Sequence, residues 1–226
     1  MKFGAIVIGG RGKIGGHVAS ANKAGAYLRT KTSPVNPSSG FQAGVRNRLT
    51  TISQSWRGLT QAQRNAWNGA VSQFQKTDIF GDLKNPSGFS LFVRLNTNVI
   101  LLGGTLLTTP PHATALDQVS GCALTYTSGT PALSVASTVV SGTDHGYKVF
   151  ATPPLQQGIQ FAKNQLRLIG SGTSAVSGTF DILSLYTARF GAVGAVGSKI
   201  FVKIVPVGHG SGVEGTGVIC SAIAAA

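Results

Sequence analysis

The chain has 226 residues, of which 42% are hydrophobic and 11% are charged, so its composition excludes a highly charged disordered chain. It carries 19 basic and 6 acidic residues, a formal net charge of +13, which favours acidic partners. Six carboxylates leave little material for paired-acid catalysis or carboxylate metal sites, so we expect no enzyme activity, no cofactor and no metal ion.

The first 35 residues have the pattern of strands. Residues 3–8 are β-rich, and residues 18–21 and 26–30 flank a turn-like segment, which predicts a hairpin with a basic face. The basic residues of this arm that we expect in assembly or phosphate contacts are Arg11, Lys13, Lys23, Arg29 and Lys31. Two interpretations stay open, because such side chains bind phosphates or the backbone carbonyls of neighbouring subunits.

A glycine-rich run in the arm, residues 10–15, matches the GxGxxG pattern of dinucleotide-binding proteins. That interpretation needs a helix after the run and an acidic residue about 20 positions further on. Gly16, Val18 and Gly25 disfavour such a helix, and the first acidic residue of the chain is Asp78. We therefore interpret the glycines as positions that permit tight turns and close contact with a neighbouring subunit.

Three helices are expected between the arm and residue 110. Pro34 and Pro37 keep the segment between the arm and the first helix extended. The first helix follows and ends at Gly58, and its apolar stripe consists of Phe41, Val45, Leu49, Ile52 and Trp56. The run 60–63 has the form of a capping box, which begins a second helix at Gln61, and a third is expected over residues 89–101. We expect Trp56 and Trp67 to pack a helical hairpin.

Four arginines lie on or near this hairpin: Arg46, Arg48, Arg57 and Arg64. One basic helix face could enter a DNA groove, but the spacing matches no recognition helix, so a solvated or subunit-facing surface is favoured.

A change in composition near residue 110 predicts a domain boundary. Residues 1–110 hold 13 of the 19 basic residues and two of the six acidic ones. Beyond it, short β-rich runs are separated by Gly, Ser, Thr and Pro, at residues 123–127, 133–140, 147–151, 165–169, 199–205 and 218–223. The sequence thus predicts an α+β protein with a basic anchoring domain (1–110) and an immunoglobulin-like or fibronectin-like sandwich (111–226). Residues 181–190 are expected to form a helical turn between the sheets.

The remaining candidates for chemistry are weak. Cys122 and Cys220 sit in apolar, strand-like stretches, and we favour buried free thiols, although a bridge between them stays open. The histidines are scattered without metal-ligand spacing, and the pair at 144–145 is better explained by a turn than by a hydrolase triad. No apolar run is long enough for a membrane span, so we expect a soluble, unsecreted chain.

Several sequence runs resemble those of a group of phage and prophage proteins. They are RGKIGG at 11–16, GAYLR at 25–29, PVNP at 34–37, SWRGLTQAQRNAW at 55–67, YTARFG at 186–191 and KIFVK at 199–203, together with Gln42 and Arg46. The amino-terminal likeness covers about residues 10–75. The resemblance implies a virion structural protein, and it transfers no catalytic residue.

The expected function is therefore that of a non-enzymatic structural component of a phage particle, located in the virion. It would be capsid-associated, a decoration protein or a head or tail connector, and we expect it to form homo-oligomers and to contact other virion proteins. The alternative is a nucleic-acid-binding protein that packages or compacts DNA, because most of the positive charge lies in residues 1–110. A nucleotide-dependent reductase is a third, weaker possibility.

Overall fold

The computed structural model describes residues 10–22, 25–77, 81–113, 116, 119–128, 132–139, 145–173 and 177–226. These residues form the expected α+β fold, with four α-helices and four antiparallel sheets in the described part of the chain. The chain divides into two compact units, residues 1–43 and residues 44–226. The boundary near residue 110 stays a prediction.

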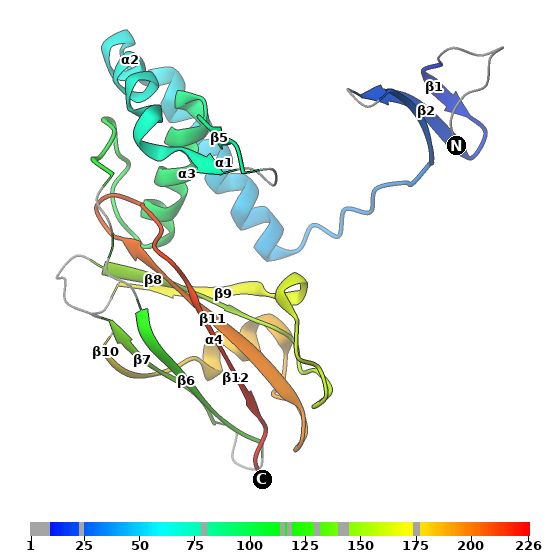
Figure 1. The fold of residues 1–226 in the computed structure, drawn as a ribbon, viewed down its shortest axis with the longest axis vertical. Helices are drawn as coiled ribbons and strands as arrows, with labels where there is room; N and C mark the ends of the chain where they lie inside the picture. The colour runs from blue at the N-terminus through cyan, green and yellow to red at the C-terminus, as the bar shows by residue number, and fades with distance from the viewer. Residues whose placement is uncertain are drawn as a thin grey trace. The chain divides into compact units, whose positions relative to one another are not determined.

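The amino-terminal unit contains a three-stranded antiparallel sheet in the order β1-β2-β3 (Figure 1). Its strands are β1 (Gly12–Ile14), β2 (His17–Asn22) and β3 (Gly25–Thr30). The expected hairpin is confirmed as β2 and β3, while the strand predicted at residues 3–8 lies outside the described residues. Residues 31–39, all described, lie outside helices and strands, as the two prolines predict.

Three helices follow, close to their predicted bounds. They are α1 (Gly40–Gly58), α2 (Gln61–Ala70), which continues into a 3₁₀ turn (Val71–Phe74), and α3 (Gly88–Leu101); β4 (Lys76–Thr77) and β5 (Leu83–Lys84) pair before α3. The capping box is confirmed, because Gln63 N donates to Thr60 Oγ1 at 3.3 Å and Thr60 N donates to Gln63 Oε1 at 2.9 Å. Thr60 therefore fixes the start of α2.

The helical core forms around Phe92 of α3. The rings of Trp56 and Trp67 lie 5.1 and 5.2 Å from the ring of Phe92, so the two tryptophans meet through α3 rather than across a two-helix hairpin. The α1 stripe is buried at Ile52, but Val45 and Leu49 are 60% and 50% exposed. The reason is length, since α1 has 19 residues and α2 only 10, so α2 cannot cover the whole stripe.

Residues beyond 118 form two antiparallel sheets, in the orders β10-β7-β6 and β12-β11-β8-β9 (Figure 1). The strands are β6 (Val119–Thr127), β7 (Ala132–Val139), β8 (His145–Ala151), β9 (Arg167–Gly172), β10 (Ser177–Asp181), β11 (Lys199–Gly208) and β12 (Val218–Ile223). A 3₁₀ turn (Lys163–Gln165) precedes β9. The predicted helical turn is α4 (Leu183–Phe190), which connects β10 of one sheet to β11 of the other.

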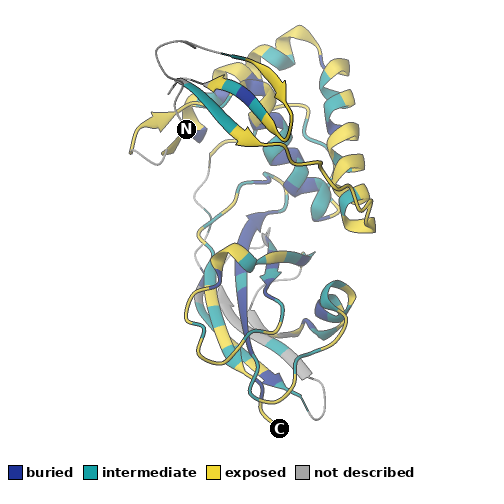
Figure 2. Ribbon diagram, turned by 90° about the vertical axis from the view of Figure 1, so that its right-hand side faces the viewer, coloured by how far each residue is buried: buried dark blue, intermediate teal, exposed yellow. Residues whose placement is uncertain are grey.

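One core lies among β6, β8, β9, β11 and α4. Alternation along β11 buries Ile200, Val202 and Ile204 completely in this core, and Figure 2 shows the buried course of this strand. Tyr186 of α4 is also fully buried, and its hydroxyl donates to Thr152 O at 3.1 Å. Burial raises the pKa of Tyr186, because the ionised phenolate would lose its hydration.

The two cysteines form a disulfide, so the expectation of free thiols is wrong. Cys122 lies on β6 and Cys220 on β12, with Cα atoms 5.6 Å apart. Both side chains face the shared core because each is in phase with the inward positions of its strand. Next to the disulfide, Ala225 N donates to Tyr126 O at 3.0 Å and Ser128 N donates to Ala225 O at 2.9 Å. The chain after β12 thus joins the edge of β6.

Among the described residues, none of the helices is both long and apolar enough to cross a membrane.

Candidate functional site

The cations of the arm gather on one face of the β1-β2-β3 sheet. Lys13 pairs with Val18, and Val18 pairs with Arg29, so these three residues form one row across the strands. Directly opposed residues point to the same face, and every second residue along a strand shares it. Tyr27 and Arg29 therefore lie on the same face as Lys13, and Lys31, which directly follows β3, lines one pocket with Lys13 and Arg29. We call Lys13, Arg29 and Lys31 the cationic face.

The opposite face of the sheet is apolar. It carries Ile14, Ala19 and Leu28, of which Ala19 is 2% exposed and Leu28 is partly buried. Strand alternation thus keeps the lysine and arginine side chains of this sheet on the face that also holds Val18, and leaves the other face mostly apolar.

The cationic face borders a pocket of about 460 Å³ within the amino-terminal unit. Its lining residues are Gly12, Lys13, Val18, Arg29, Thr30, Lys31, Thr32, Ser33 and Pro34. Lys31 is held there because its backbone N donates to Gly16 O at 2.8 Å. The three cations are exposed, and each hydroxyl of the lining segment adds a hydrogen-bond donor, so the pocket suits an anion.

The glycine-rich run forms a hairpin and lacks the helix that a dinucleotide-binding loop of this pattern requires. Ile14 pairs with His17 across Gly15 and Gly16, so a strand and not a helix follows the run. The backbone φ of Gly12 is +128° and that of Gly15 is +56°, both in the region that glycine adopts without strain. The turn function inferred for these glycines is confirmed at Gly15, between β1 and β2, while contact with a neighbouring subunit stays a prediction.

The other predicted site residues are dispersed. Arg11 precedes β1 and is exposed, and Lys23 lies outside the described residues. Arg46, Arg48 and Arg57 are on α1, where residues 46 and 48 project about 200° apart around the axis. Arg64 on α2 donates through Nη2 to the backbone O of Arg57 at 2.7 Å, so it supports the α1–α2 junction. The helical arginines therefore form no single cluster.

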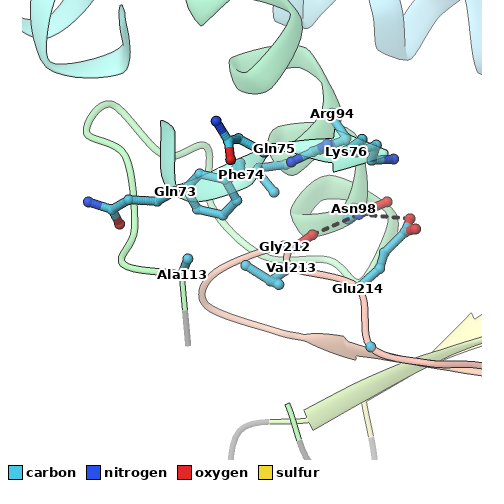
Figure 3. Close-up of a pocket in the computed structure, with 12 residues that line it drawn as sticks. Gln73, Phe74, Gln75, Lys76, Arg94, Asn98, Ala113, Gly212, Val213 and Glu214 are labelled. Atoms are coloured by element: carbon cyan, nitrogen blue, oxygen red, sulfur yellow. Dashed lines mark hydrogen bonds between the residues drawn. The ribbon is translucent and has the colours of Figure 1, made fainter. Parts of the chain in front are cut away.

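A second pocket, which the sequence did not indicate, lies where α3 meets the loop after β11. It measures about 320 Å³ and is lined by Gln73, Phe74, Gln75, Lys76, Arg94, Leu95, Asn98, Ala113, Gly212, Val213, Glu214 and Gly215 (Figure 3). Asn98 Nδ2 donates to Gly212 O at 2.7 Å and to Glu214 Oε1 at 3.1 Å. These bonds attach α3 to the loop.

Lys148 of β8 completes this junction. Its side chain is 10% exposed, and Nζ donates to Asn98 Oδ1 at 2.9 Å and forms a salt bridge with Glu214 Oε1. Burial alone would raise the pKa of Glu214, but its bonds and charge interactions with Lys148, the Asn98 hydrogen bond and the charge of Lys76 together lower it. Burial lowers the pKa of Arg94, against the attraction of Glu214. The cluster joins α3, β8 and the loop after β11, and Glu214 pairs with the buried charge of Lys148, so we assign the cluster a structural role.

Replacing Glu214 with Gln is expected to destabilise the protein by about 2 kcal/mol, because Lys148 would keep a buried charge without its partner. The carboxylate is 43% exposed, so the loss is smaller than the roughly 3–5 kcal/mol of a fully buried pair. Urea unfolding at pH 7 measures it. Since folding lowers the pKa of Glu214, the difference from the wild type should vanish as pH falls from about 4 through the folded pKa.

The double variant Lys148→Met/Glu214→Leu is the matched control, because it removes both charges and leaves no unpaired ion. It should cost less than Glu214→Gln. A pH-independent loss in Glu214→Gln would instead show that the carboxylate charge contributes nothing.

Other chemistry finds little support in the described part of the chain. No group of three or more His, Cys, Asp or Glu residues there could hold a metal ion. His17 is exposed on the apolar face of the arm sheet, and Asp144 of the adjacent Asp-His pair lies outside the described residues.

The chain matches none of the protein-family models, curated proteins and solved structures with which it was compared. The function therefore has to be argued from the residues and their geometry.

Proposed function

We propose that this protein is a non-enzymatic structural component of a phage particle, capsid-associated, decorating or connecting head and tail, that assembles through its basic amino-terminal region. The observation that carries the proposal is the gathering of Lys13, Arg29 and Lys31 on one face of a sheet whose other face is mostly apolar. Such a face suits attachment to an acidic surface and needs no catalytic group. The resemblance of several sequence runs to phage and prophage proteins supports the same role.

In this proposal the two predicted domains have different roles. Residues 1–110 anchor the chain, and residues 111–226 form an immunoglobulin-like or fibronectin-like sandwich that faces neighbours or projects outward. Support comes from seven short antiparallel strands in two sheets, with strands from both contributing to one core. Immunoglobulin domains also place seven strands in two sheets around one core.

Exposed apolar side chains support the expected homo-oligomer. On α1, Val45 and Leu49 are 60% and 50% exposed, and on the loops of the sheet region Phe161 and Val196 are 76% and 61% exposed. A subunit in a symmetric assembly can bury such surface against its neighbours.

The experiment is mass spectrometry of purified particles, with the copy number taken from band intensity. Hundreds of copies per particle would place the protein in a shell lattice, and about a dozen would place it in a neck or tail ring. Both results support the proposal. Absence of the protein from finished particles would overturn it, and so would turnover of a small molecule by the purified chain.

A further inference from the structure

This chain carries few acidic residues that could oppose the cationic face. The whole sequence has six acidic residues, and the first of them is Asp78. Glu214 already pairs with Lys148. With 19 basic residues and six acidic ones, a second copy of the protein is a poor electrostatic match for Lys13, Arg29 and Lys31, which favours a polyanion of another kind as the ligand.

The face combines charges with an aromatic ring. Tyr27 is two residues before Arg29 on β3 and pairs with Ser20 on β2, so its ring lies beside the small hydroxyl side chain of Ser20. It is partly buried, so part of its side chain is accessible to a ligand. An aromatic ring among cations on a sheet is a surface on which a nucleic-acid base can stack while its phosphates meet the charges.

We propose that the face formed by Lys13, Tyr27, Arg29 and Lys31 binds single-stranded nucleic acid, with the cations on successive phosphates and Tyr27 against a base. This inference rests on the proposed function and names the ligand of its basic region.

The dimensions of the sheet fit this ligand. Adjacent residues of one strand face are about 6.8 Å apart, and Lys13 and Arg29, two strands apart, are separated by about 9.6 Å between their backbones. Long side chains can bridge these distances to phosphates of one extended strand. The pocket of about 460 Å³ beside the face lies in the roughly 300–1,000 Å³ range of ligand sites. Thr32 and Ser33 in its lining can donate hydrogen bonds to phosphate oxygens.

The experiment measures binding of the full chain to a short labelled oligo-dT by fluorescence anisotropy, from about 50 to 200 mM salt. The variant Lys13→Gln/Arg29→Gln/Lys31→Gln should bind about 100-fold more weakly near 100 mM salt, and the slope of log K against log salt should become shallower by about 2. All three side chains are exposed, so the circular dichroism melting curve should not change.

The matched control removes the same charge elsewhere. Lys84→Gln/Lys163→Gln/Arg167→Gln changes three exposed cations of the second unit and should stay within about threefold of the wild type. Equal losses in both triple variants would overturn the proposal, because binding would then follow the net charge of +13. Lys13→Arg/Lys31→Arg keeps the charge and should retain binding.

Tyr27→Leu tests the base contact. It should weaken oligo-dT binding by about 5- to 100-fold and leave duplex binding within about twofold, because a paired base cannot stack on the ring. Equal losses for both ligands would contradict the stacking contact. Polyglutamate of matched charge is the remaining competitor, and if it displaces oligo-dT at equal concentration, the ligand is an acidic protein and the proposal fails.

The two proposals fail separately. Wild-type protein missing from purified particles would end the structural role, whatever the purified chain binds. Wild-type protein present in particles but unable to bind oligo-dT would end the nucleic-acid inference and leave the structural role intact.

Discussion

Replacing Cys122 and Cys220 together with alanine is expected to lower the free energy of unfolding by about 4–5 kcal/mol. The bridge closes a loop across a sequence separation of 98 residues, and in the chain-entropy account a long loop restricts the unfolded chain most strongly. For a chain of this size the melting temperature should fall by roughly 10–20 °C. Differential scanning calorimetry with and without reductant measures the effect.

The double alanine variant also serves as the control for the reductant. Its melting temperature should not respond to dithiothreitol, whereas that of the wild type should fall to the same value. Thiol titration of the denatured wild type should find no free thiol, because Cys122 and Cys220 are the two cysteines of the chain. Two titratable thiols, or a melting curve that ignores the reductant, would contradict the bridge.

Replacing Trp67 with Ala is expected to cost about 3–5 kcal/mol. The indole is fully buried against Phe92, and its Nε1 donates to Thr108 O at 3.0 Å. Removing it leaves a cavity in the helical core and an acceptor without its donor, which are two separate losses. Guanidinium unfolding followed by circular dichroism at the helical band measures the change, since fluorescence would lose one of its two tryptophans.

Two further variants separate these losses. Trp67→Phe keeps most of the ring volume and removes the N–H, so it should cost about 1–2 kcal/mol. Phe89→Ala changes a ring that is 40% exposed and packs edge-on against Trp56, so its cost should be smaller than that of Trp67→Ala. If Trp67→Ala lowered the free energy of unfolding no more than Phe89→Ala does, the contacts of the indole with Thr108 and Phe92 would contribute little to stability.

Local chemistry made the helices predictable. Thr60 and Gln63 form the start of α2 from residues three positions apart, so no knowledge of the rest of the chain was needed. The apolar stripe predicted that α1 is a helix and which of its faces is apolar. It did not predict which residues of that face would be buried. Burial of Ile52 and exposure of Val45 depend on how far α2 and α3 extend, and a sequence pattern does not contain those lengths in space.

The strands show where local rules stop. The strand predicted over residues 199–205 stops before Pro206, which cannot donate to a ladder, yet β11 continues to Gly208. Gly215 N donates to the carbonyl of Pro206 at 2.9 Å, so this carbonyl faces away from β8. The nitrogen of a strand residue points to the same side as its carbonyl, so Pro206 is tolerated because β8 needs no N–H from it. The disulfide was unpredictable for a similar reason, since it depends on β6 meeting β12 in space.

The candidate sites divide in the same way. The cationic face follows from alternation within about twenty residues of chain, so the sequence could indicate a basic hairpin. The cluster of Asn98, Lys148 and Glu214 joins residues as far apart as 116 positions and had no local signal. One hint was present, because a lysine within the apolar strand run 147–151 calls for a buried acidic partner.

The join between β6 and the residues after β12 has a consequence for behaviour at high concentration. Open strand edges invite pairing with other copies, which leads to fibres. Ala225 occupies part of the edge of β6, and the disulfide keeps the two strands together. At the far sides of the two sheets the edge strands are β9 and β10, of six and five residues, and β12, of six residues, is the other edge of the four-stranded sheet. Short edge strands offer few free backbone groups to a second copy, which limits strand exchange between crowded copies.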